Sequence, residues 1–423
     1  MKSLFFIVFV VLAAKCDAQT SQEFFQSKYR EGVKAYESKD YFAFIRAMQS
    51  ADSVRPNTYS ILYNIAGGQA LTGQSDASLK SLAKAVWINV SKQFMNDSDF
   101  VSIWNTPGMK DIFTLIDSIN KPISLTETAF TMEDNGFHPE GIAYDAKTKR
   151  FFIGSIRQRT IAVRDEKGTV NTSFFKKTDR LFCVMGMKVD SKRRALWVAT
   201  SVMPEMTGYA DSLQGKAAVA RFNIDSGDLE KIYSIAGEHV FGDLAIHPSG
   251  DVYISDSGEP SLYKISSKDD QLKLWLTFPT AWNLQGLDFS SDGNTLFVAD
   301  YISGLYCVSL KTQTIDKIGF DTPNALRGID GLYFYKNSLL ALQNGTNPLR
   351  ACRYYLNNDQ TRITKMEFVE KATDNLGEPT LGVVSGDTFY FIANSPWGAY
   401  DRKHQFDASK AQKPVVRKYE MGR

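Results

Sequence analysis

The feature that most constrains this chain is a short unit that recurs six times after residue 122. Each copy starts with a channel-facing position and a small residue, continues through alternating apolar residues to a tight turn, and ends in a second apolar run closed by Ser, Asp or Asn. The copies begin near Glu140, Met185, Gly242, Gln285, Asp330 and Glu378, which are 43 to 57 residues apart. Such spacing is typical of propeller blades of roughly 40 to 50 residues. We therefore expect an all-β six-bladed propeller over residues 122–423.

A β-sandwich is the competing architecture for a chain with many short strands. Regular repetition of one hairpin favours the propeller, because a sandwich does not need its strands to repeat at a fixed interval. A propeller must also join its first and last blades, since closure removes the free sheet edges. We expect segment 124–132 or the tail 414–421 to complete the ring.

Residues 19–121 have a different periodicity and predict an α-helical domain ahead of the propeller. Apolar residues recur at helical spacing, with breaks near residues 38–40, 55–57 and 72–74. Gly32, Ala51 and Pro56 resemble signature positions of a tetratricopeptide repeat of about 34 residues, in which small residues let two helices cross closely. The domain either packs on the propeller or binds a protein partner in its groove, and the sequence leaves both open.

The first 18 residues have the pattern of a cleaved signal peptide. One Lys precedes an apolar run, and small residues follow it up to Ala18. We therefore expect a secreted or periplasmic protein. No later stretch reaches the roughly 20 apolar residues of a membrane span. The chain has 49 basic and 47 acidic residues and a net charge of +2, which argues against a nucleic-acid partner.

The starts of the inner strands predict the functional site. In a propeller the first residue of each innermost strand faces the central channel, so side chains distant in sequence converge there. These starts include Glu140, Gln285, Asp330 and Glu378, with Asp243 one position inside its blade. Carboxylates in one narrow channel repel each other unless some are protonated or a cation lies among them. Oxygen-only ligands favour calcium over zinc or copper.

At these residues the propeller resembles the senescence-marker-protein/gluconolactonase (regucalcin-like) superfamily. Glu140 in PEGI matches a metal-binding Glu of that family, and Asp330 in IDGL matches an Asp that binds the metal and serves as general base. Gln285 stands where the family has a metal-binding Asn, and Gly242-Asp243 stands where it has an Asn-Asp dipeptide. The resemblance thus implies a metal site of Glu140, Gln285 and Asp330.

Two functions are consistent with this sequence. The resemblance implies a calcium-dependent hydrolase of a lactone or similar ester, in which Asp330 takes a proton from the attacking water. Asp243 and Glu378 would complete the metal shell or bind the substrate, and His138 would border the mouth of the channel. The alternative is a non-catalytic binding or scaffold protein that presents its propeller faces and helical repeats to a partner.

Overall fold

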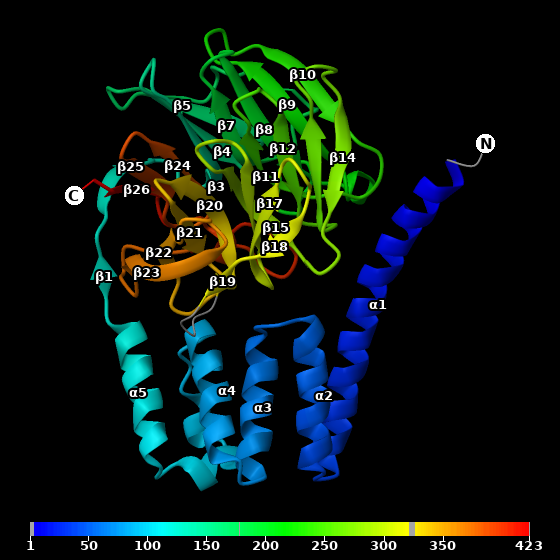
Figure 1. Ribbon diagram of the computed structural model, residues 1–423. Helices are drawn as coiled ribbons and strands as arrows, with labels where there is room; N and C mark the ends of the chain where they lie inside the picture. Colours follow the sequence, from blue (N-terminus) through cyan, green and yellow to red (C-terminus); the bar gives the residue numbers. More distant parts are fainter. Residues whose placement is uncertain (1–3, 177, 321–325, 423) are drawn as a thin grey trace.

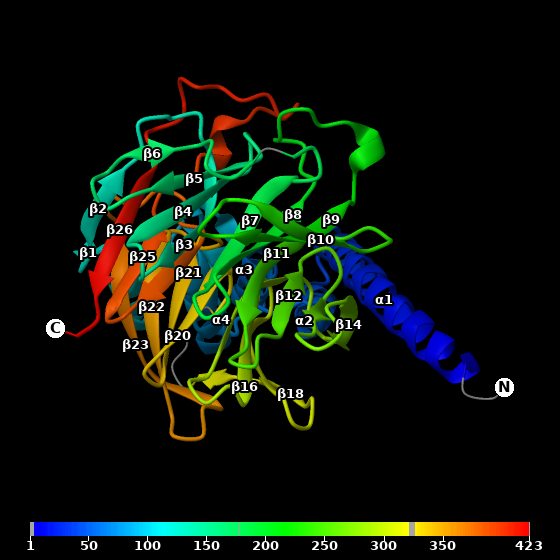
Figure 2. The same ribbon diagram turned by 90° about the horizontal axis from the view of Figure 1, so that it is seen from above.

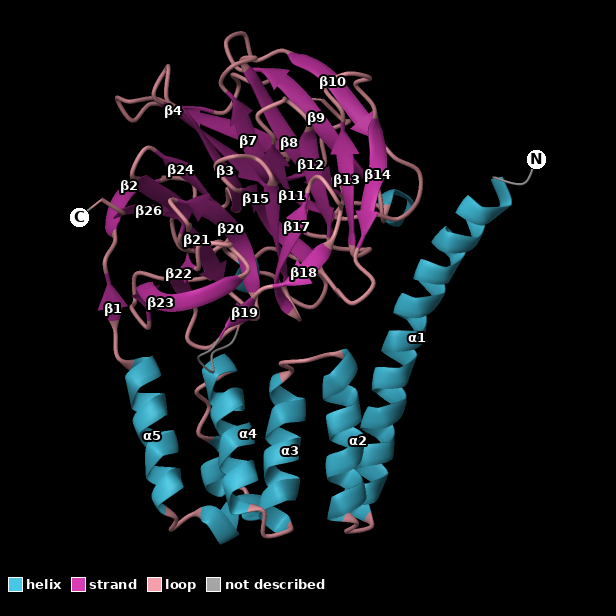
Figure 3. Ribbon diagram, viewed as in Figure 1, coloured by secondary structure: helices cyan, strands magenta, loops and turns pink. Residues whose placement is uncertain are grey.

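The computed structural model describes residues 4–176, 178–320 and 326–422, with side chains described from Ser21 onward. It confirms a six-bladed β-propeller preceded by a helical segment. Most of the helices lie side by side below the propeller in Figure 1, and the first helix, in dark blue, rises past them at the right of the view. Figure 2 looks down on the same molecule, with the blades in front of the helices, and Figure 3 separates helix from strand by colour.

Within the described residues the helical segment contains five α-helices. They are α1 (Leu4–Glu37), α2 (Tyr41–Val54), α3 (Tyr59–Leu71), α4 (Ser75–Ile88) and α5 (Pro107–Asn120), with the short 3-10 helices η1 (Gln93–Asn96) and η2 (Ser98–Ile103) before α5. The three predicted breaks all fall between helices. Ala51 is fully buried, and a Cβ atom at Gly32 would lie 2.5 Å from the terminal methyl of Met48, which would have to move, so the helices cross closely at small residues.

The predicted signal peptide lies in α1, which continues without a break into the helical segment. Its cleavage, and with it export, stays a prediction. Across the described part of the chain, no helix has both the length and the apolar character needed to cross a bilayer.

The first three blades follow one another along the chain, each built from four antiparallel strands. Blade 1 contains β3 (Pro139–Asp145), β4 (Arg150–Ser155), β5 (Thr160–Arg164) and β6 (Val170–Asn171). Blade 2 contains β7 (Cys183–Asp190), β8 (Ala195–Ser201), β9 (Ala217–Asn223) and β10 (Leu229–Ser234), with η3 (Asp211–Leu213) in a loop. Blade 3 contains β11 (Phe241–Ile246), β12 (Val252–Asp256), β13 (Ser261–Ile265) and β14 (Leu272–Thr277).

The last three blades include the strands that close the ring. Blade 4 contains β15 (Leu284–Phe289), β16 (Thr295–Asp300), β17 (Gly304–Ser309) and β18 (Ile315–Lys317). Blade 5 contains β20 (Ile329–Tyr335), β21 (Ser338–Gln343), β22 (Arg350–Leu356) and β23 (Arg362–Lys371), and β1 (Ile123–Ser124) and β19 (Gly319–Phe320) pair with β23. Blade 6 contains β24 (Gly382–Ser385), β25 (Thr388–Ile392), β26 (Val415–Glu420) and β2 (Glu127–Thr131), with η4 (Trp397–Ala399) after β25.

Ring closure uses both of the segments named from the sequence. They pair with each other in blade 6, where β2 runs antiparallel to β26. The outermost strand of this blade, β2, therefore comes from the start of the propeller sequence, and the other three strands come from its end. This arrangement holds the two ends of the ring together through backbone hydrogen bonds.

The inner strands of blades 1 to 5 all carry an irregularity at the same place. In each, the register to the next strand shifts just after the first residues, so that one extra residue is inserted in the inner strand. A bulge of this kind changes the direction of the side chains around it and is common next to functional sites. The extra residue falls at the predicted channel positions, including Glu140, Gln285 and Asp330.

Glycine follows the channel position because neighbouring inner strands approach each other closely. A Cβ atom at Gly141 would meet the backbone carbonyl of Met185 in the next blade, and one at Gly286 would meet the backbone of residues 330–332. Blade 3 has Asp243 at this position instead. Its carboxylate is accommodated because the facing residue is Gly186, whose missing side chain leaves the space.

The helical segment packs on the propeller face where the inner strands start. Trp282, just before β15, donates from its indole Nε1 to the carbonyl oxygen of Val54 at 2.9 Å. Arg327, just before β20, donates to the carbonyl oxygen of Asn57 at 3.1 Å. At the end of β23, the buried Lys371 ammonium donates to the carbonyl of Ile119 in the last turn of α5, which stabilises that helix end.

Candidate functional site

Three acidic side chains lie close together at the mouth of the channel. Glu140 lies in the bulge of β3, Asp330 in the bulge of β20, and Glu378 in the loop before β24. These elements belong to blades 1, 5 and 6, which are neighbours in the closed ring. The negative charges of Asp330 and Glu378 both act on Glu140. We refer to Glu140, Asp330 and Glu378 as the mouth cluster.

Glu140 is buried and held by two donors from blade 6. Its Oε2 atom accepts hydrogen bonds from the indole Nε1 of Trp397 at 3.0 Å and from the hydroxyl of Ser395 at 3.4 Å. Burial raises the pKa of Glu140 well above its usual value, and the charge of Asp330 raises it further, while the bond from Trp397 opposes this shift. The Glu140 carboxylate is therefore fixed in position, but its charge is not compensated.

Asp330 is positioned by an amide and a phenol. The Asn344 side chain donates to Asp330 Oδ2 at 2.7 Å, and the Tyr301 hydroxyl donates to the Asn344 side-chain oxygen at 2.9 Å. Burial raises the pKa of Asp330 to about 7, despite the opposing bond from Asn344, and burial also raises the pKa of Glu378 to about 7. Both groups therefore change charge near neutral pH, which is the range in which a general base works best.

The chemistry of the mouth cluster suits a hard divalent cation. Its ligand atoms are all oxygen, and no Lys, Arg or His among the described residues forms an ion pair with any of the three. The cluster is open, because its oxygens do not come within 4.8 Å of one another as a set. Calcium accepts six to eight oxygen ligands, including water, and tolerates such spacing better than magnesium does.

A second group of charged side chains, of which only Asp243 was predicted from the sequence, lies beside the mouth cluster. Lys188 of blade 2 approaches Asp243 of blade 3 at 3.6 Å and lies over the ring of Tyr333 of blade 5, 4.6 Å from the ring centre. Asp288 of blade 4 accepts two backbone hydrogen bonds at 2.9 Å. Burial raises the pKa of Asp288 to about 6, and the charge of Lys188 opposes that shift. We refer to Lys188, Asp243 and Asp288 as the lysine cluster.

The bulge explains why Lys188 and Asp288 lie in the channel. Side chains of a regular strand return to the same face after two residues, but an inserted residue moves that return to the third position. Lys188 is three residues after Met185, and Asp288 is three residues after Gln285. A search at this interval in the six copies would have found both residues.

The structure revises the position of Asp243. The side chain is 1% exposed and belongs to the lysine cluster, so it does not line the mouth as a substrate ligand would. Neither of its carboxylate oxygens has a hydrogen-bond partner among the described residues. Burial raises its pKa, and the charge of Lys188 opposes the shift. Lys188 is therefore the group that allows this carboxylate to be buried.

His138 also has a different position from the one expected. It is fully buried, its Nδ1 lies 2.7 Å from the Tyr400 hydroxyl, and its ring packs edge-on against Trp397 at 4.6 Å. Burial lowers its pKa to about 3, so the ring is neutral. With no exposed surface, His138 cannot contact a substrate directly, and it supports Trp397, which in turn holds Glu140.

Gln285 lies on the side of the mouth nearest the helical segment. Its amide nitrogen donates to the Asn283 side chain at 2.6 Å, which leaves the amide oxygen free of that bond. Gln285 and Tyr301 line the same cavity, and Tyr301 leads through Asn344 to Asp330. Gln285 is thus near the mouth cluster, and its role as a ligand stays a prediction.

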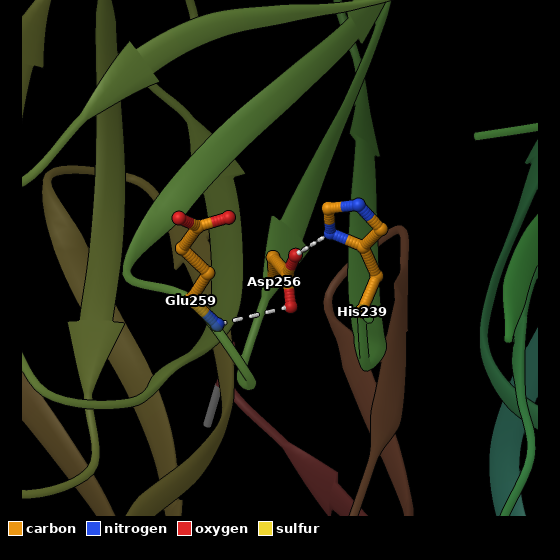
Figure 4. A group of neighbouring side chains, drawn as sticks. All are labelled: His239, Asp256 and Glu259. Carbon is orange, nitrogen blue, oxygen red and sulfur yellow. Dashed lines mark hydrogen bonds and ion pairs between the residues drawn. The ribbon is translucent and has the colours of Figure 1, made fainter. Parts of the chain in front are cut away.

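One other group of possible metal ligands lies elsewhere, in blade 3. His239, Asp256 and Glu259 have ligand atoms within 4.8 Å of one another. The His239 ring nitrogens both face acceptors, Asp256 Oδ2 at 2.7 Å and the Ala236 carbonyl at 3.1 Å. Figure 4 shows that Glu259 contacts Asp256 through its backbone nitrogen. The group is explained by Asp256 closing the loop at the end of β12, as Asp300 does after β16.

No family model and no curated protein matches this chain. Solved structures do resemble it. A luciferin-regenerating enzyme is 16% identical, with 71% of this chain and 96% of that chain covered and a TM-score of 0.48. A gluconolactonase from Xanthomonas campestris is 13% identical (70% and 88% covered, TM-score 0.45), and the PQQ-bound aldose sugar dehydrogenase from Streptomyces coelicolor is 12% identical (70% and 97% covered, TM-score 0.46). The assignment of the fold rests on the strand pairing described above.

Proposed function

We propose that this protein hydrolyses an ester or lactone at the mouth of the propeller channel, with the help of a divalent cation, most simply calcium. The observation that carries the proposal is the mouth cluster, in which three carboxylates from neighbouring blades have raised pKa values and no cationic partner among the described residues. Buried carboxylates usually have such a partner, and a divalent cation would supply it.

Glu140 and Asp330, with the amide oxygen of Gln285, would hold the cation. When bound, a divalent cation polarises a carbonyl oxygen and stabilises the charge that develops on it. Trp397 and Ser395 keep the Glu140 carboxylate oriented toward the site. The Glu140 ligand is therefore held in place, while the other oxygens would move closer together or bind the ion through water.

Asp330 would act as the general base. The hydrogen bond from Asn344 occupies its Oδ2 atom and fixes the plane of the carboxylate, so Oδ1 remains to accept a proton from the attacking water. Tyr301 holds the Asn344 amide with its oxygen toward the phenol, which directs the NH2 group at Asp330. Glu378, whose pKa is also about 7, would bind a polar group of the substrate.

The double variant Asp330→Asn with Glu140→Gln tests this proposal. Both substitutions keep the size of the side chain and remove its charge, so we expect the protein to fold while hydrolysis of every active substrate falls by at least about 100-fold. Activity is measured on a panel of lactones and aryl esters, with calcium and with a chelator. Thermal unfolding with and without calcium measures binding of the ion, because a bound ion stabilises the folded state.

The substitution Asp374→Asn, at an exposed position in the loop between β23 and β24, is the matched control, and it should change neither activity nor the calcium response. Hydrolysis that survives in the double variant would refute the site. If the wild-type protein hydrolyses no member of the panel and does not respond to calcium, the non-catalytic binding protein becomes the better interpretation.

A further inference from the structure

The loop between α2 and α3 brings a charged residue of the helical segment to the propeller face. Residues 55–58 form this loop, and it is held by the bonds from Trp282 to Val54, the last residue of α2, and from Arg327 to Asn57 described above. Arg55 lies between these two contacts. The loop therefore occupies a defined place beside the inner-strand starts of blades 4 and 5.

The Arg55 guanidinium contacts two aromatic rings, one from each part of the molecule. Its central carbon lies 5.3 Å from the ring centre of Phe25 in α1 and 5.3 Å from that of Trp282 in the propeller. Such cation–π contacts hold a guanidinium while leaving its N–H groups free at the edge. The buried Nε atom of Arg55 has no hydrogen-bond partner among the described residues. A buried N–H without a partner is costly, so a ligand acceptor there would be favoured.

A second guanidinium lies close to the first. The positive charge of Arg55 acts on Arg327 and, after burial, is the main cause that lowers the pKa of Arg327. Within the described residues no carboxylate comes within ion-pair distance of either side chain. The charge of Asp300 acts on Arg327 from a longer distance, and with no direct ion pair two neighbouring guanidiniums favour the binding of an anion.

A cavity of about 370 Å³ opens beside Arg55. Its lining residues are Arg55, Trp282, Asn283, Gln285, Tyr301 and Ile302. Arg55 of the helical segment thus gives the cavity a positive charge, and Trp282 and Tyr301 give it aromatic surface. Gln285, a predicted channel residue, also lines it. This volume and mixture of surfaces suit a small organic molecule.

We propose that Arg55, supported by the field of Arg327, forms a subsite for an anionic oxygen group of the substrate, a carboxylate or a phosphate. Guanidinium groups bind both through paired hydrogen bonds. The subsite would make the helical segment part of the substrate site, and the substrate class would be acidic esters or lactones.

Two side chains, Tyr301 and Asn344, connect the subsite with the proposed catalytic base, Asp330. Tyr301 lines the cavity and donates to Asn344, which donates to Asp330. A substrate anchored at Arg55 would therefore extend past Tyr301 toward the mouth cluster. This step rests on the proposed function, whereas the anion-binding subsite itself can be tested without it.

Binding is measured by calorimetry with glutarate, a dicarboxylate that cannot be hydrolysed, in the Asp330→Asn variant and in the presence of a chelator. We expect glutarate to bind and Arg55→Met to weaken its binding roughly 10- to 100-fold, because a charged hydrogen-bond partner is lost while the apolar packing stays. The same measurement with glycerol 2-phosphate shows which oxyanion is preferred. Arg55→Lys should retain part of the binding, and Arg46→Gln, at an exposed position of α2, should have no effect.

Hydrolysis gives an independent readout in the otherwise unmodified protein. We expect 5-oxotetrahydrofuran-2-carboxylate to be preferred over its carboxamide, and Arg55→Met to remove that preference through a higher KM. Unchanged glutarate and glycerol phosphate binding in Arg55→Met would overturn the subsite even if hydrolysis is found. Loss of binding in Arg55→Met would support the subsite even if no hydrolysis is found, so the two proposals fail separately. If Arg55→Met unfolds, the comparison is made with Arg55→Lys and Arg55→Gln.

Discussion

The mouth cluster and the lysine cluster bury similar acidic groups in two different ways. In the lysine cluster, Asp243 and Asp288 share the positive charge of Lys188, so the protein itself supplies the compensation. In the mouth cluster, the compensation is left to protons or to an ion from solution. The difference indicates that the lysine cluster stabilises the folded protein. The mouth cluster lowers the stability of the folded protein, and in return it keeps carboxylates that can bind a cation or a proton.

The largest expected effect comes from removing the internal cation. Lys188→Met should lower the free energy of unfolding by about 3–5 kcal/mol, because it leaves buried carboxylates without their partner. Urea unfolding measures the change. The exposed Lys192→Met should shift stability by less than about 0.5 kcal/mol. Adding Asp243→Asn to Lys188→Met should recover a large part of the loss. If Lys188→Met lowers the free energy of unfolding by less than about 1 kcal/mol, Lys188 does not stabilise the buried carboxylates, and the two clusters do not differ in the way described.

The pH dependence of stability should reveal the mouth cluster. Asp330 has a pKa of about 7 in the folded protein and a value near 4 when unfolded, so between these values the folded state binds more protons. Stability of the chelator-treated protein should therefore fall by about 2–3 kcal/mol as the pH rises from about 4 to about 7. Asp330→Asn should reduce this slope and leave the part that Glu378 and Asp288 contribute, and calcium should reverse the Asp330 part in the wild-type protein only. A slope that is equal in Asp330→Asn and in wild type would contradict the assignment.

The smallest effect concerns the residue that orients Glu140. Trp397→Phe keeps the ring against His138 and removes the hydrogen bond to the Glu140 carboxylate. We expect calcium affinity, measured by calorimetric titration, to fall about tenfold, as is common when a residue that supports a metal ligand is replaced. Trp275→Phe on the outer strand β14 is the control. An unaltered affinity in Trp397→Phe would show that Glu140 does not need this support.

The sequence predicted the parts of the molecule that follow from local repetition. The spacing of the six units identified the blades, and the inner-strand starts identified Glu140, Asp330 and Glu378, which the structure brings together. Breaks at turns such as residues 38–40 identified the helix ends. These features depend on residues that are neighbours in the chain, and hydrophobic periodicity reports on them directly.

The parts that could not be predicted depend on a shift of register or on docking. Lys188 and Asp288 were missed because the bulge moves the channel-facing position, and a regular two-residue alternation places them on the wrong face. The position of Arg55 was missed because no local pattern tells where a helical segment packs. His138 was misplaced because the sequence does not show that Trp397 and Tyr400, about 260 residues later, pack against its ring and bury it.

The pairing of β2 with β26 has a consequence for how the chain is made. The strand near residue 130 emerges long before its partner, which lies near residue 417. Until then, the inner strands β24 and β25 can lie beside blade 1, but the outer half of blade 6 is missing. A ribosome that stops shortly before Val415 would release a chain in which β25 and β2 have unpaired edges, which cellular proteases and chaperones recognise. The ring is therefore completed only in chains that extend through residue 420.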